Sequence, residues 1–227
     1  MNNTAKTALI IAIVAGIGIG IAGFSMMQKQ TGKNPVVAQN ESEAMVKSTD
    51  KAANLRVLLN ALDREHVNLA SAATRNGFDG DPDFKASAGA LDNNSIALSK
   101  AVGSVYGPEA EAKFLDIWRS HIGFFVDYTV AAKGGDKAGM DKAVQNLGGY
   151  ADAISDLLSG ANPNLPREAV HSVIMEHIGL LKGAVDAYGA GDYEMSYAKQ
   201  HEADEQVGVI ADTLSGAIVK QYPEKFN

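Results

Sequence analysis

One short pattern occurs three times along the chain and constrains its fold more than any other feature. A histidine is followed by Val or Ile, then by twelve further residues, then by Gly-Asp. The copies begin at His66, His121 and His177, which are 55 and 56 residues apart. Recurrence at a nearly constant period is typical of a duplicated structural unit. We therefore expect one unit that is built three times.

Each copy carries the signals of a helical hairpin. Apolar residues recur at steps of three and four around each histidine, which indicates one buried face of a helix. The Gly of each Gly-Asp pair can end that helix, and the Asp can cap the next one. Pro108 and Pro166 stand at expected helix starts, where Pro is tolerated. The predicted fold class is all-α: a six-helix bundle of three antiparallel hairpins over residues 50–107, 108–164 and 165–227.

The N-terminal region predicts attachment to a membrane. Residues 8–27 contain no charged side chain, and a helix of that length spans about 30 Å, the thickness of the apolar core of a bilayer. We predict a transmembrane anchor here, with an export signal as the alternative. Residues 1–7 form a short flank and the polar residues 28–49 a flexible stalk. Gly16 and Gly20 can let two such anchors associate in a homo-oligomer.

Charge and composition exclude several classes of function. Residues 1–33 hold three Lys and no acid, so the formal charge of −7 leaves 17 basic and 27 acidic groups, or −10, on the rest of the chain. Such an acidic domain does not favour binding to nucleic acid. The flank is too short for a domain, so we expect the helical domain to face outside the cytoplasm, at the cell surface or in the periplasm. The absence of Cys excludes thiolate metal sites.

The three repeated histidines are the main candidates for a functional site. If the hairpins are related by an approximate threefold axis, the imidazoles of His66, His121 and His177 converge, as in sites for copper or zinc. The alternative is that each is a core residue whose repetition reflects duplication. A second candidate pair is His201 and Glu205, which share one helix face. No nucleophile elbow, His-Glu-x-x-His or phosphate-binding loop occurs, so we predict a protein that is not an enzyme.

Several segments resemble an uncharacterised family of exported all-α bacterial proteins. They cover most of residues 55–226 in the same order: EHVNLA (65–70), ALDNNS (90–95), SVYG (104–107), SHIGFFVDY (120–128), GDYEMSY (191–197) and SGAIVKQYPEKF (215–226). Members often bear the label "copper amine oxidase". The resemblance implies export, a helical fold and an association with copper, whereas that oxidase activity needs Asn-Tyr and His-x-His motifs, which are absent here. Gln206 stands where the family tends to have His.

Two functions remain open from the sequence. The first is a membrane-anchored, extracytoplasmic helical domain that binds copper, zinc or a metal cofactor through His66, His121 and His177. The second is a non-catalytic structural or interaction module of the cell surface, in which the histidines belong to the core. The geometry of the three imidazoles is the observation that separates them.

Overall fold

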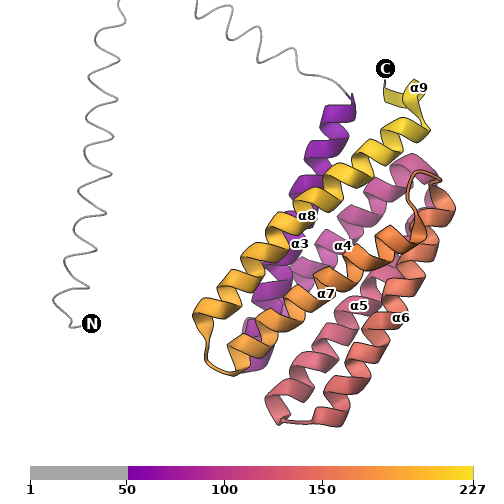
Figure 1. The fold of residues 1–227 in the computed structure, drawn as a ribbon. Helices are drawn as coiled ribbons and strands as arrows, with labels where there is room; N and C mark the ends of the chain where they lie inside the picture. Colours follow the sequence, from indigo (N-terminus) through magenta and orange to yellow (C-terminus); the bar gives the residue numbers. More distant parts are fainter. Residues whose placement is uncertain (1–50, 227) are drawn as a thin grey trace, which may run out of the picture. The chain divides into compact units, whose positions relative to one another are not determined.

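The computed structural model describes residues 51–226, and this part of the chain is helical throughout, without a strand. Six long helices run side by side, and a short one follows them (Figure 1). The prediction of an all-α fold is confirmed. The helices are α3 (Lys51–Asp79), α4 (Phe84–Tyr106), α5 (Pro108–Gly134), α6 (Lys137–Ala161), α7 (Arg167–Gly189), α8 (Tyr193–Gln221) and α9 (Pro223–Phe226).

The six long helices close into a ring. Each packs against the next in sequence, and α8 returns to pack against α3, beside which it lies in Figure 1. Helices α3, α5 and α7 also contact one another, whereas α4, α6 and α8 lie between them on the outside. Apolar side chains from all six helices fill the interior, among them Val67, Leu98, Phe125, Leu147, Ile178 and Val207. Side chains on α3, α5 and α7 are therefore the ones that meet at the centre.

The three Gly-Asp pairs form the same turn. Gly80, Gly135 and Gly191 have φ values of 75°, 67° and 76°, in the left-handed region that favours glycine. After each glycine, the Asp N–H donates to the carbonyl five residues earlier, at 2.8–2.9 Å. Bonds of this kind satisfy carbonyls at the end of a helix. The helix ends that the sequence predicted lie at these turns.

The capping role predicted for the three Asp residues is correct in two hairpins and wrong in the first. The carboxylates of Asp136 and Asp192 each accept a bond from a backbone N–H three residues on, at 3.0 Å. Asp81 does not cap α4, because Pro82 follows it and the helix begins only at Phe84. Asp83 takes the capping position there without a side-chain bond.

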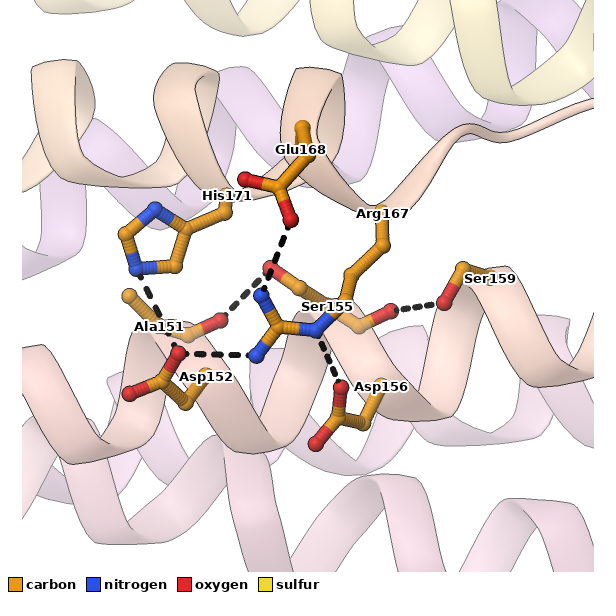
Figure 2. A network of polar contacts seen from close by, with 8 residues as sticks. All are labelled: Ala151, Asp152, Ser155, Asp156, Ser159, Arg167, Glu168 and His171. Carbon is orange, nitrogen blue, oxygen red and sulfur yellow. Dashed lines mark hydrogen bonds and ion pairs between the residues drawn. The ribbon is translucent and has the colours of Figure 1, made fainter.

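Charged pairs join neighbouring helices on the surface. Arg56 and Arg64 of α3 pair with Asp212 and Asp204 of α8. Near the start of α7, Arg167 contacts three carboxylates, two of them on α6 (Figure 2). Exposed pairs of this kind contribute little individually to stability. The apolar interior supplies most of the stabilisation.

The predicted anchor, residues 8–27, and the stalk, residues 28–49, lie outside the described residues. Within residues 51–226, no helix combines the length and the apolar character that crossing a bilayer requires. The described residues belong to one compact unit by their contacts. The three predicted hairpin ranges each contain one pair of long helices.

The left-handed turn at Gly135 gives a test of the fold. Replacing Gly135 by Ala is expected to lower the free energy of unfolding by about 1 kcal/mol, because an L side chain is strained at this φ. Gly149→Ala is the matched control: Gly149 lies inside α6, and a methyl group added there has no heavy atom within 4 Å, so Ala should stabilise by about 0.5–1 kcal/mol. Urea denaturation measures both, and equal effects of the same sign would contradict the assignment of the turn.

Candidate functional site

Two of the three repeated histidines meet at the centre of the bundle. His66 lies on α3 and His121 on α5, with 3% and 6% of their surfaces exposed. Their Nε2 atoms are 3.4 Å apart. The pair exists because α3 and α5 pack together in the interior and each histidine belongs to the buried face of its helix. Sequence reasoning placed both residues there; their separation is a property of the tertiary structure.

Aromatic rings enclose the pair. The Trp118 ring lies 4.9 Å from the ring of His66 and 4.8 Å from that of His121, centroid to centroid. Tyr150 of α6 stacks on His121 at 4.6 Å. These contacts fix the planes of the imidazoles and exclude water from their faces. The two side chains are held in one orientation by packing rather than by charge.

The third histidine lies close by but does not complete a cluster. His177 of α7 bonds through Nδ1 to Oε1 of Gln206 on α8, at 3.1 Å. It is near enough to lower the pKa of His66 and His121 electrostatically. Within residues 51–226, no three His, Asp or Glu side chains are gathered closely enough to hold a metal ion. Of the three imidazoles that were expected to converge, only those of His66 and His121 are therefore in contact.

Desolvation keeps all three imidazoles neutral near pH 7. Removal from water lowers the pKa of His66 to about 3 and that of His177 to about 4, and it holds the pKa of His121 well below its usual value. The neighbouring histidines lower the pKa values of His66 and His121 further. Neutral imidazoles are the form in which histidine binds metals, since one ring nitrogen then keeps a lone pair.

The neighbours of the outer ring nitrogens are hydrogen-bond acceptors. Asn94 donates from Nδ2 to the Leu62 carbonyl and to Glu65. Its Oδ1 remains as an acceptor beside His66, and this side chain raises the pKa of His66. The backbone of Trp118 acts in the same way on His121. Neither Nδ1 reaches full hydrogen-bond geometry, but both face oxygens. The tautomers decide what the inner contact is: a proton on one Nε2 makes it a hydrogen bond, whereas protons on both Nδ1 atoms leave two Nε2 lone pairs facing each other.

Each inner histidine has a partner on the outer helix of its own hairpin, which sequence reasoning missed. Asn94, Tyr150 and Gln206 follow the three histidines by 28, 29 and 29 residues. They contact His66, His121 and His177 respectively. The recurring offset was present in the sequence, but the three residue types differ, so no repeat search based on residue identity finds it. Gln206 was singled out only through the family resemblance.

The histidines border a cavity of about 370 Å³. Apolar side chains form most of its wall, and the remainder includes Asp63, Trp118, Tyr150 and Gln206. His177 is half-buried, and it lines this cavity. A second cavity of about 350 Å³ also touches His66 and His121, so the pair is bordered by both cavities. Cavities of this size and composition are typical of sites for small ligands.

Asp63 is a further buried group that sequence reasoning did not identify. It lies one turn before His66 on α3 and is 7% exposed. Its Oδ2 has no hydrogen-bond partner. Desolvation raises the pKa of its carboxyl to about 7, and Asp63 in turn helps to raise the pKa of Tyr150, mainly an effect of burial. An unpartnered carboxylate oxygen in an apolar core is costly unless it is protonated or bound.

The remaining histidines lie nearer the surface. His201 and Glu205 share one face of α8 as predicted, with Nε2 and Oε1 3.5 Å apart and side chains 72% and 68% exposed. His171 lies 3.6 Å from Asp152 in the network around Arg167 (Figure 2). Both are separate from the buried pair. They offer matched controls for experiments on the buried histidines.

Comparison of the chain with protein-family models, with curated proteins and with solved structures finds no match. The resemblance described from the sequence segments therefore stays a prediction. The candidate site rests on its own geometry: two neutral imidazoles in contact, a third nearby, and a cavity that borders all of them.

The lowered pKa of His177 predicts that the fold loses stability in acid. Its pKa is about 4 in the fold against 6.5 in an exposed chain, so the unfolded chain binds a proton that the native state does not. The contribution is fully present above pH 6.5 and is lost as the pH falls to about 4. In His177→Gln, the fall in unfolding free energy over this range should be smaller; in the exposed control His201→Gln it should be unchanged. Urea titrations at pH 7, 6, 5 and 4 measure it, and identical slopes would contradict the desolvation of the His177 ring.

The pKa of Asp63 predicts the opposite dependence of stability on pH over nearly the same pH range. Its pKa is about 7 in the fold and 3.8 in an exposed chain, so the native state binds the extra proton and stability falls as the pH rises from about 4 to about 7. Asp63→Asn stays uncharged throughout. Its stability relative to the natural chain should rise over this window, by an amount of the order of a few kcal/mol. The exposed control Asp141→Asn should show no such trend; a flat difference for Asp63→Asn would place this carboxyl in water.

Proposed function

We propose that the helical domain binds a transition-metal ion, copper or zinc, through Nε2 of His66 and His121; His177, the third histidine of the predicted set, bonds to Gln206 and stays outside this pair. One observation supports this most directly. Two neutral imidazoles face each other through their Nε2 atoms at 3.4 Å. When both rings carry their proton on Nδ1, the two Nε2 lone pairs repel at this distance, and a cation between them converts the repulsion into two bonds.

The donor chemistry fits such an ion. Ligand nitrogens lie about 2.0–2.1 Å from zinc in tetrahedral sites, which puts two of them roughly 3.3–3.4 Å apart, close to the separation of the two Nε2 atoms. Imidazole suits both zinc and copper. Oxygens of Asn94 and Gln206 and the backbone of Trp118 adjoin the outer nitrogens, the usual place of groups that orient metal-binding histidines.

The proposal includes the setting of the domain. Residues 8–27 anchor the domain in the membrane, and residues 28–49 are the flexible stalk between the anchor and the domain. The domain faces outside the cytoplasm. It consists of three hairpin repeats, as the shared Gly-Asp turns and the three outer-helix partners support. The excess of acidic groups on this part of the chain raises the local concentration of cations rather than of anions.

The alternative is a structural or interaction module in which the imidazoles belong to the core. The stacking of His121 on Tyr150 and the tight packing of His66 against Trp118 favour it. In that case one Nε2 carries a proton and donates it to the other. This alternative predicts that removing an imidazole lowers stability while the natural chain holds no metal.

Metal loading of the full chain tests the proposal. We expect one copper or zinc ion per chain after dialysis against a low concentration of free metal, measured by elemental analysis. His66→Gln and His121→Gln should each lose this ion, because a single remaining imidazole of the pair is a weak site. The controls His171→Gln and His201→Gln should retain it.

Three outcomes decide between the two functions. Stoichiometric metal that is lost only in the buried variants supports the proposal. Metal that is lost in His201→Gln instead assigns the ion to the exposed pair with Glu205. A natural chain without bound metal, together with destabilised but folded His66→Gln and His121→Gln, supports the structural role.

A further inference from the structure

The cavity beside the histidine pair has a wall of unusual composition. Leucine, isoleucine, valine and alanine side chains from several helices form most of it, and Phe114 and Phe125 add aromatic surface. Neither Lys nor Arg lines it, whereas Asp63 and Glu176 do. A ligand with a negative headgroup, such as a carboxylate or a phosphate, would therefore meet only like charge there. The wall selects uncharged, largely apolar molecules.

Apart from Nδ1 of His66 and of His121, two polar atoms of residues in this wall lack partners. One is Oδ2 of Asp63, a hydrogen-bond acceptor, and the other is Nε1 of Trp118, a donor; both are buried and neither makes a hydrogen bond in the structure. Buried polar groups are almost always hydrogen-bonded, and each exception calls for an explanation. Both residues line the same cavity, and an acceptor and a donor within one wall suit a ligand group that both donates and accepts.

We propose that this cavity is a binding site for an apolar organic molecule that carries a hydroxyl group, which donates to Asp63 and accepts from Trp118. A hydrocarbon fills the same space but leaves both atoms unpaired, and an ether can only accept. A hydroxyl meets both needs without bringing a charge into the interior. The site does not depend on a bound metal, because neither Asp63 nor Trp118 belongs to the proposed ligand set.

The raised pKa of Asp63 is consistent with this ligand class. A carboxyl that titrates near pH 7 interchanges between an acceptor-only form and a form with its own O–H. A hydroxyl is a partner for either form, since it accepts from the protonated acid and donates to the ionised one. The site therefore does not require one fixed protonation state.

A matched pair of probes tests the proposal. Octan-1-ol and heptyl methyl ether have the same atoms and similar length, but only the alcohol donates a hydrogen bond. We expect the metal-free full chain, solubilised identically for both probes, to bind octan-1-ol about tenfold more tightly. Trp118 is the only tryptophan of the chain and lines the cavity, so its fluorescence reports binding, and calorimetry gives the affinity.

Variants of Asp63 test whether this residue causes the preference for the alcohol over the ether. Asp63→Leu should bind the two probes equally, because the acceptor is gone while the apolar wall remains, and Asp63→Asn should keep part of the preference through its amide oxygen. Asp141→Leu, which replaces an exposed acid outside the cavity, should behave like the natural chain. Far-UV circular dichroism verifies that each variant is folded.

Two results would overturn the proposal. Failure of the natural chain to bind either probe means that the cavity admits no such ligand. Equal affinity for alcohol and ether, or a preference that survives in a folded Asp63→Leu, means that Asp63 does not recognise the hydroxyl. Each result stands apart from the metal experiment, which uses other residues and another readout.

Discussion

The burial of two imidazoles against each other, away from water, is the constraint on which the rest of the site depends. Desolvation removes the option of a positive charge on either ring, so each keeps a nitrogen lone pair. Packing against Trp118 and Tyr150 then fixes where these lone pairs point. Had the rings lain in water, they would be partly protonated and free to turn, and their separation would carry no chemical meaning.

The architecture creates this environment by dividing its helices between two roles. Helices α3, α5 and α7 meet at the centre and bring the histidines, whereas α4, α6 and α8 supply the residues behind them: Asn94, Tyr150 and Gln206. Each of the three hairpins therefore carries a histidine on one helix and a residue that contacts it on the other. The residue that contacts the histidine differs between the three hairpins, so the three imidazoles lie in different environments.

Local features were predicted well because their causes are local. The Gly-Asp turns follow from the freedom of glycine at positive φ, and the sequence places them without reference to the rest of the chain. The exception has a local cause as well: Pro82 delays the start of α4 and removes the capping role of Asp81. The apolar faces around His66 and His121 likewise follow from helical spacing, and both residues are buried as expected.

For the part of the chain that the structure describes, the sequence by itself determined the all-helical fold class, the positions of the Gly-Asp turns and the inward-facing helix positions of the repeated histidines. Each of these depends on neighbours within about four residues. Only the tertiary structure decided that His66 and His121 touch while His177 turns to Gln206, and that Asp63 stands unpaired beside a cavity. These depend on how far one helix is shifted and rotated against another, which is set by side-chain packing across the whole core. A repeat period along the chain contains no information on such shifts.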